Sequence, residues 1–203
     1  MRRLALALAL CALASPALAT EPAPEGDQEA MMAEWLKLAQ PGEGHQRLRP
    51  LVGSFDTVTR LWMGGPDAPA TESRGTMESS WILGGRFVRG VSKSTMMGQP
   101  YEGVAVTGYN NIRKIYESTW IDTMSTNISF SKGSMDRDGK VLTLYGEMDE
   151  PALGVYGRMV RLVLRIEGPD RHVMEMYDLH AGDGYKVFET TYTRKKGTKA
   201  PAK

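Results

Sequence analysis

Short runs of apolar and β-branched residues, separated by turn residues, make up the chain from residue 51 onward. Runs rich in Val, Ile, Thr, Tyr, Phe and Trp and bounded by Gly, Pro, Asn and Asp are typical of β-strands. We expect hairpin-length connections and no helix between them. The pattern predicts strands near residues 51–63, 70–82, 85–96, 101–109, 113–121, 126–134, 140–149, 156–167, 171–180 and 184–194.

A meander of about ten antiparallel strands has two free edges, and closing the sheet on itself removes them. Glycines inside the predicted strands, such as Gly90, Gly103 and Gly146, fit the bends of a barrel. The sequence therefore predicts an all-β fold, an antiparallel meander barrel of about ten strands. A two-sheet sandwich is the alternative, and the uniformly short connections favour the barrel.

A helical periodicity precedes the strands and predicts a short amphipathic helix near residues 28–39, ended by Pro41-Gly42. The helix fits two places, across a mouth of the barrel or against its outer wall, and the sequence does not choose between them. Its apolar stripe consists of Met31, Met32, Trp35, Leu36 and Leu38.

Residues 1–19 have the pattern of a cleaved signal peptide. Arg2-Arg3 supplies the positive start, and the apolar run at residues 4–13 is shorter than the roughly 20 residues of a membrane span. Ala17-Leu18-Ala19 has the small-x-small form of a cleavage site. We expect a cut after Ala19 and a periplasmic or secreted protein. An uncleaved membrane anchor is the alternative.

The only cysteine, Cys11, lies within this predicted signal. Cleavage would remove disulfides, thiol catalysis, zinc–thiolate sites and iron–sulfur clusters from the possible chemistry. Lipid attachment at Cys11 is an alternative, although Leu10 stands where a small residue is usual.

Charge and hydropathy limit the partners. The chain has 25 basic and 24 acidic residues, so we expect no nucleic-acid partner, which would require a basic surface. We expect no membrane span after signal cleavage, because no second apolar segment is long enough.

The expected organisation is a signal peptide at 1–19, a leader with the amphipathic helix at 20–44, a β-barrel domain at 45–196 and a basic tail at 197–203.

The chain from His45 to Lys195 resembles the family called domain of unknown function 1579. The resemblance implies a calycin-like barrel, related in shape to lipocalins and fatty-acid-binding proteins. Gly53-Ser54-Phe55 is similar to the Gly-x-Trp opening of lipocalins, with Phe in place of Trp. The stretches that carry the family resemblance are Leu51 to Phe55, Leu83 to Phe87, Gly103 to Asn110, Tyr116 to Asp122 and Glu189 to Lys195.

A barrel of this size can enclose one small ligand, and a binding protein for a small, largely apolar molecule is the first functional hypothesis. Strand side chains alternate between the two faces, but neither of the two strands tested in this way shows a clean apolar face. Which face points inward is therefore open. The predicted ligand-binding residues are the aromatic and methionine side chains Trp62, Trp81, Phe87, Tyr101, Trp120, Met174, Met176 and Tyr185, with Arg89, Glu117 and Glu175 as polar anchors.

The three histidines do not predict a metal site. His172 and His180 lie eight residues apart on one predicted strand, roughly 26 Å at 3.3 Å per residue, so they cannot share one metal ion. No cofactor is predicted. Haem held by His172 or His180 is the alternative, because some related barrels hold haem through a histidine on a late strand.

Two further functions remain open. An isomerase or hydrolase could use inward carboxylates or His172 as acid and base. The mid-strand carboxylates Glu117, Glu147, Glu175 and Glu189 are the candidates, with the alternative that they face water. A module that binds a partner protein in the cell envelope, without a ligand, is the third hypothesis.

Overall fold

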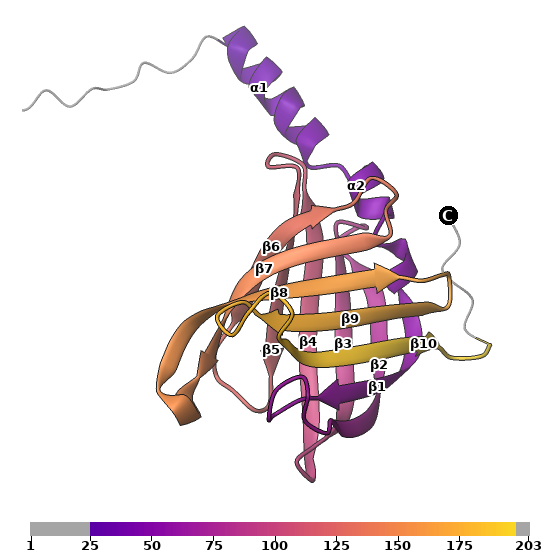
Figure 1. The fold of residues 1–203 in the computed structure, drawn as a ribbon. Helices are drawn as coiled ribbons and strands as arrows, with labels where there is room; N and C mark the ends of the chain where they lie inside the picture. Colours follow the sequence, from indigo (N-terminus) through magenta and orange to yellow (C-terminus); the bar gives the residue numbers. More distant parts are fainter. Residues whose placement is uncertain (1–24, 198–203) are drawn as a thin grey trace, which may run out of the picture. The chain divides into compact units, whose positions relative to one another are not determined.

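The computed structural model describes residues 25–197, and these contain a closed antiparallel barrel of ten strands (Figure 1). Each strand pairs with the next along the chain, and β10 pairs with β1, so the sheet has no free edge. This confirms the predicted barrel over the sandwich. The strands are β1 (Gly53–Leu61), β2 (Thr71–Ile82), β3 (Phe87–Met96), β4 (Gln99–Asn110), β5 (Ile115–Asp122), β6 (Ser129–Met135), β7 (Val141–Glu150), β8 (Val155–Ile166), β9 (Arg171–Asp178) and β10 (Lys186–Arg194).

Every predicted strand is present, with its ends displaced by a few residues. The expectation of no helix between strands is wrong at one place, where the short 3-10 helix η2 (Pro151–Leu153) joins β7 to β8. Pro151 has a fixed φ and no N–H, which suits the first position of such a turn.

The β3–β4 connection illustrates how local sequence sets the fold. Met97 and Gly98 have positive φ angles of 50° and 77°, as a two-residue hairpin of type I′ requires. Glycine tolerates this conformation without a steric cost. The tight turn places Met96 opposite Gln99 and fixes the register of the whole pair.

One end of the barrel is covered by the segment that precedes β1. This segment contains α2 (Glu43–Gln46) and the 3-10 helix η1 (Arg49–Leu51). We call this end the closed end, and the opposite one the far end. The far end is formed by the connections at residues 62–70, 97–98, 123–128, 151–154 and 179–185.

The hydrophobic core sits at the closed end. Leu48 and Val52 come from the covering segment and are at most 5% exposed. They pack against inward side chains of the barrel, which stabilises the cover by burying apolar surface. The buried cluster consists of Leu48, Val52, Val88, Tyr116, Leu142, Leu144 and Leu164.

The predicted N-terminal helix is α1 (Glu25–Leu38), a few residues earlier in its start than expected. Lys37 in its last turn forms an ion pair with Glu34 at 3.5 Å and carries the charge that a helix C-terminus favours. The apolar stripe residues Met31, Met32 and Trp35 are exposed. The predicted signal peptide and most of the predicted basic tail lie outside the described residues.

Candidate binding site in the barrel interior

Strand register identifies one continuous inward face around the barrel. Residues that are directly opposite on neighbouring strands share a face. Starting from Phe55, the pairs lead through Met77 and Ser92 on one side and through Arg194 on the other. Phe55 is fully buried. The opposite face carries most of the charged side chains of the barrel and is the outer wall.

The inward face changes character along the barrel. Large apolar side chains fill the closed end, whereas the middle of β1 to β7 carries mostly Gly, Ala, Ser and Thr. On β8 and β9 the inward residues are larger, as at Val160, Leu162 and Met176. Several of these inward positions, including Ser92, Ser94 and Ala105, are half-buried rather than buried. The small inward residues are Thr57, Thr59, Ser73, Gly75, Ser79, Gly90, Ser92, Ser94, Gly103, Ala105, Thr107, Ser118, Ser129, Ser131, Gly133, Gly146 and Thr190.

Some of the inward hydroxyl groups bond to one another across strands. Thr59 Oγ1 and Thr190 Oγ1 lie 2.9 Å apart, and Thr107 Oγ1 and Ser118 Oγ lie 2.8 Å apart. A hydroxyl has one donor and two acceptor positions, so each pair keeps capacity for a further hydrogen bond. The wall is therefore weakly polar and uncharged in this part, which is more polar than the sequence led us to expect.

An ion pair lies on the inward face near the far end. Arg158 Nη2 is 2.5 Å from Asp178 Oδ2, and the two side chains are 16% and 4% exposed. Asp178 Oδ1 also accepts a hydrogen bond from the backbone N–H of His180, at 2.9 Å. Arg158 Nε is buried and has no hydrogen-bond partner among residues 25–197, and such a buried donor is costly unless something else satisfies it.

A second carboxylate, Asp122, lies on the inward face at the end of β5. Its Oδ2 accepts hydrogen bonds from Trp120 Nε1 at 2.8 Å and from the Tyr101 hydroxyl at 3.3 Å. Its Oδ1 accepts one from the backbone N–H of Met124 at 2.8 Å, as in an Asx turn. Burial, followed by the charge of Asp122, raises the pKa of Tyr101 well above its usual value.

Five of the predicted binding residues lie on the inward face. Trp81 and Met174 pack against the closed-end core. Tyr101, Trp120 and Met176 occupy inward positions closer to the far end. The structure thus brings these five into one interior.

Four other predicted binding residues face outward and cannot line this interior. They are Phe87, Arg89, Glu117 and Glu175. Each is one residue out of phase with an inward neighbour, such as Val88 beside Phe87 and Arg89. Alternation indicates which residues share a face, but register with the other strands is needed to decide which face is inside.

The two remaining predicted residues, Trp62 and Tyr185, lie in connections at the far end. The centre of the Trp62 ring lies 5.7 Å from Lys186 Nζ. Tyr177, the residue opposite Lys186 on β9, faces outward. The Tyr185 hydroxyl lies so close to Gly65 that a side chain there would meet it at 2.8 Å. Trp62 and Tyr185 therefore lie at the far end of the barrel and do not share the surroundings of Trp120.

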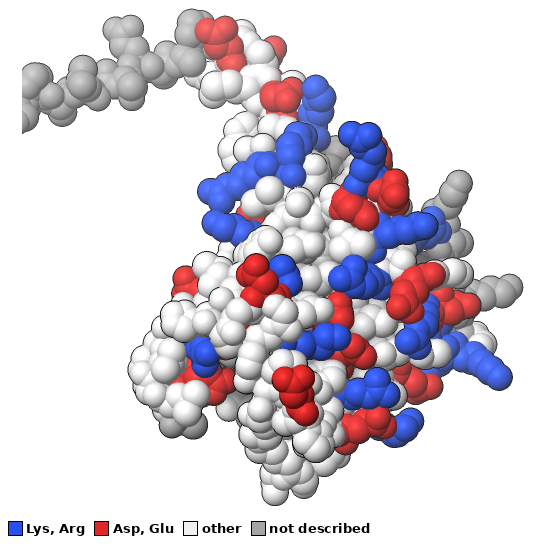
Figure 2. Space-filling model, viewed as in Figure 1, with Lys and Arg blue, Asp and Glu red and all other residues white. Residues whose placement is uncertain are grey.

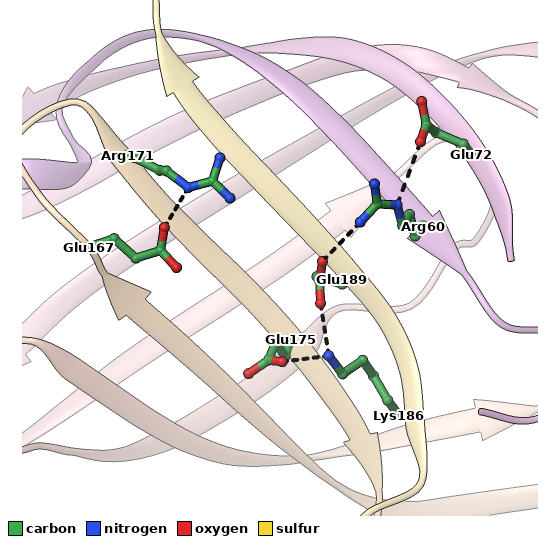
Figure 3. Close-up of polar contacts among 7 residues, drawn as sticks. All are labelled: Arg60, Glu72, Glu167, Arg171, Glu175, Lys186 and Glu189. Carbon is green, nitrogen blue, oxygen red and sulfur yellow. Dashed lines mark hydrogen bonds and ion pairs between the residues drawn. The ribbon is translucent and has the colours of Figure 1, made fainter. Parts of the chain in front are cut away.

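Glu175 belongs to a ladder of charges across the outer wall (Figure 3). Lys186 Nζ is 2.6 Å from Glu175 and 2.8 Å from Glu189, and Arg60 links Glu189 to Glu72 at 3.6 Å and 3.5 Å. Burial alone would raise the pKa of Glu175, but the bond and charge of Lys186, together with hydrogen bonds from Arg165 and Tyr177, outweigh burial and lower the pKa. Figure 2 shows such mixed charges over the outer wall. The enzyme hypothesis named four mid-strand carboxylates, and all four face outward, so they form no acid–base pair inside the barrel. They are Glu117, Glu147, Glu175 and Glu189.

The two haem candidates lie in very different surroundings. His172 is inward at the closed end, with its ring stacked on Tyr192 at 4.3 Å between centroids and edge-on to Phe55 at 4.8 Å. Burial, then the charge of Arg194, lowers its pKa to about 3. His180 is exposed in the connection after β9. Haem binding at either stays a prediction.

The outer wall carries a shallow depression at the closed end, with a volume of about 150 Å³. It is lined by Phe87, Gly108, Tyr109, Asn110 and Glu117. Phe87 and Glu117, which the sequence placed in the ligand site, lie together here. The depression is far smaller than the roughly 300 Å³ at which ligand pockets begin.

Asp122, Arg158 and Asp178 were not among the predicted binding residues. A carboxylate at the end of a strand usually caps a turn, and the bond from the Met124 N–H to Asp122 is of that kind. Asp178 shares a strand face with Met174 and Met176, and that alternation was a usable signal. Arg158 carries no such signal, because a lone arginine in a strand usually faces water.

Two absences hold for the described residues. Among residues 25–197, no group of three or more His, Cys, Asp or Glu side chains is placed to hold a metal ion. In the same part of the chain, no helix is long and apolar enough to cross a membrane.

Three solved structures are similar to this chain to different degrees. The S-type phycobiliprotein lyase of Guillardia theta is 10% identical, with a TM-score of 0.50, over 77% of this chain and 99% of that one. A redesigned β barrel is 14% identical, with a TM-score of 0.38, over 78% of this chain and all of the other. A redesigned barrel bound to DFHBI is 15% identical, with a TM-score of 0.36, over 71% and 99%.

No curated protein matches the sequence significantly. A family match covers residues 40–194, which is nearly the whole barrel with its covering segment. It confirms the resemblance found in the sequence stretches around Gly53-Ser54-Phe55 and along β4 and β5. The chain therefore belongs to the family described as "Protein of unknown function (DUF1579)".

Proposed function

We propose that the barrel binds a small molecule in its interior and admits it through the far end. The observation that carries the proposal is the distribution of side-chain size along the inward face. The apolar core fills the closed end, and small residues such as Ser92, Ser94 and Ala105 line the middle of β1 to β7. In a barrel of eight or more strands, small inward side chains leave room for a ligand.

The wall chemistry indicates the kind of ligand. Trp120 and Met176 offer apolar and polarisable surface, and the inward hydroxyl groups offer hydrogen bonds. A largely apolar molecule that also carries hydrogen-bonding groups would match this wall. Exposed apolar side chains at the far end support entry from that side. They are Met63, Met97, Met124, Ile128, Leu153 and Tyr156.

The test fills the interior with one added side chain. Ala105 lies between Gly90 and Trp120 on the inward face, so Ala105→Phe would project a ring into the middle of the barrel. Val106→Phe adds a ring to the outer wall of the same strand and is the matched control. The probe is Nile red, a neutral dye whose fluorescence rises in apolar surroundings.

We expect wild-type protein and Val106→Phe to bind Nile red at one site, and Ala105→Phe to bind at least tenfold more weakly while remaining folded. Absence of Nile red binding by wild type would contradict the proposal. So would a loss of stability in Ala105→Phe of about 3 kcal/mol, the cost of overpacking a filled core. Ser92→Leu serves as a second filling variant.

We also propose that the protein is exported and cut after Ala19. The support is the sequence of residues 1–19, with its positive start, short apolar run and small-x-small end. Expression of the full chain in a Gram-negative bacterium, followed by N-terminal sequencing of the periplasmic fraction, tests this. A first residue of Thr20 is expected, and a chain retained with Met1 in the membrane fraction would contradict it.

A further inference from the structure

We propose that the ligand of the interior is an organic cation, bound between the carboxylate of Asp122 and the ring of Trp120. This inference rests on the proposed binding function and specifies the chemical class of the ligand. Three features of the inward face support this inference. Among the described residues, Asp122 has a charge without an ion-pair partner, the Trp120 ring is held in a fixed position, and the strand neighbours of Trp120 are small.

The first feature is the charge of Asp122. Within residues 25–197, Asp122 has no ion pair, and its three hydrogen-bond donors are the neutral groups of Trp120, Tyr101 and Met124. Neutral donors orient a carboxylate but do not cancel its charge. A carboxylate offers about four lone-pair positions, so one remains for a ligand.

The other inward charges do not compensate Asp122. Arg158 is paired with Asp178 at 2.5 Å, so that pair is neutral as a whole. Arg194 lies at the closed end, where it contacts Asp170 at 3.2 Å and three backbone carbonyl groups. Among these four inward side chains, Asp122 is therefore the one whose charge has no ion-pair partner. A concave wall of low dielectric strengthens the pull of such a charge on cations.

The second feature is the fixed position of Trp120. Its indole lies over Gly103, where an added Cβ would come within 2.1 Å of the ring. Its Nε1–H is held by Asp122 at 2.8 Å. Gly103 below and Asp122 beside it thus set the plane of the ring. A tryptophan face attracts a cation within about 6 Å of its centre, and more strongly when water is excluded.

The third feature is the space around the ring. The inward strand partners of Trp120 are Ala105 on β4 and Ser129 on β6. Neither side chain is long enough to cover an indole. A substituted ammonium or a planar aromatic cation could therefore lie against the ring while its charge faces Asp122. A bare metal ion would not use the ring, and an anion would meet the carboxylate.

The experiment compares two dyes that differ in charge and in one methyl group. Thioflavin T carries a permanent positive charge, and its analogue without the ring N-methyl group is neutral and nearly the same shape. Both are titrated by fluorescence into wild-type protein, Asp122→Asn and the control Glu102→Gln. Glu102 lies on the outer wall of β4, where it pairs with exposed Lys93 at 3.3 Å, so its variant removes one negative charge nearby but outside.

We expect wild type and Glu102→Gln to bind thioflavin T about tenfold more tightly than the neutral analogue, and Asp122→Asn to lose most of this preference. Equal binding of the two dyes by wild type would overturn the inference, and so would an unchanged preference in Asp122→Asn. If Asp122→Asn fails to fold, the wild-type comparison alone decides. Failure of both dyes and of Nile red would overturn the binding function itself, whereas binding of only the neutral probes would overturn the cation site alone.

Discussion

The guanidinium carbon of Arg194 lies 4.5 Å from the centre of the Phe55 ring, at the closed end of the barrel. The same guanidinium donates hydrogen bonds to the backbone carbonyl groups of Val52 at 2.9 Å, Pro50 at 3.1 Å and Pro169 at 3.1 Å. The last strand is thereby tied to the segment that enters the first strand. Arginine suits this role because its planar fork presents several donors in fixed directions.

Replacement of Arg194 by lysine tests this closure. Lysine keeps the charge but cannot supply the three directed hydrogen bonds, each worth about 1 kcal/mol net. We expect Arg194→Lys to lower the free energy of unfolding by about 2–4 kcal/mol in urea titrations. Arg171→Lys is the control, because Arg171 is exposed and forms its ion pair with Glu167 on the outer wall; it should change stability by less than about 0.5 kcal/mol. Equal effects of the two substitutions would contradict the assigned role.

The sequence predicted the ten strands because turn residues separate them clearly. The hairpin at Met97-Gly98 and the proline at 151 are examples, and both delimit strands close to where the pattern placed them. The closure of the barrel followed from the absence of long connections. Both conclusions depend on local chemistry, which a single sequence contains.

The inward face could not be predicted in the same way. On β5, Tyr116, Ser118 and Trp120 share one face and Glu117 lies on the other. The outer wall of this barrel also carries Val, Ile and Phe, so neither face is clearly apolar. Asp122 shows a further limit, because a carboxylate after a strand predicts a turn cap, and only the paired strands reveal that it also contacts Trp120 and Tyr101.

The buried ring of His172 makes stability depend on pH. Its pKa is lowered to about 3 in the folded state, from an ordinary value of 6.5, chiefly by burial and then by Arg194. The unfolded chain therefore binds a proton below pH 6.5 while the folded chain does not, so stability falls as pH drops from 6.5 toward 3. Each pH unit in this window costs about 1.4 kcal/mol.

The variant His172→Phe removes this dependence but keeps an aromatic ring beside Phe55 and Tyr192. Urea unfolding at pH 7.0 and pH 4.5 should show wild type losing about 2–3 kcal/mol more than the variant on acidification. All other titrating groups are common to both proteins and cancel in the difference. The same loss in both proteins would show that His172 is not the group responsible.

Lys186 is expected to hold Glu175 ionised on the outer wall. Burial raises the pKa of Glu175, and the contact with Lys186 at 2.6 Å is the largest of the opposing effects. We expect Lys186→Met to raise the pKa of Glu175 relative to wild type, as measured by NMR titration of the side-chain carboxyl carbon. The control Lys93→Met removes a lysine from an exposed pair and should leave Glu175 unchanged.

The sign of this effect also sets a stability prediction. A depressed carboxyl pKa stabilises the fold above the unfolded pKa, and this contribution is lost as pH falls through the folded value. At pH 7, Lys186→Met should therefore lower the free energy of unfolding by about 1 kcal/mol. At pH 3 the difference from wild type should shrink. A difference that stayed constant from pH 7 to pH 3 would point to lost packing on Trp62 and Tyr177 instead.

Two glycines of the covering segment allow a matched test of the closed end. A Cβ on Gly44 would come within 2.4 Å of the Tyr109 ring, and the Gly44 carbonyl accepts a hydrogen bond from the Tyr116 hydroxyl at 3.0 Å. A Cβ on Gly42, two residues earlier, would meet no atom within 4 Å. The Tyr109 ring packs against Tyr116 and His45, with centroids 4.9 Å and 5.8 Å away, so it has little freedom to move aside. We expect Gly44→Ala to cost about 1–3 kcal/mol by overpacking and Gly42→Ala to change stability by less than about 0.5 kcal/mol in urea titrations. If both variants were equally stable, the covering segment would not be packed against the barrel as tightly as the Gly44–Tyr109 contact requires.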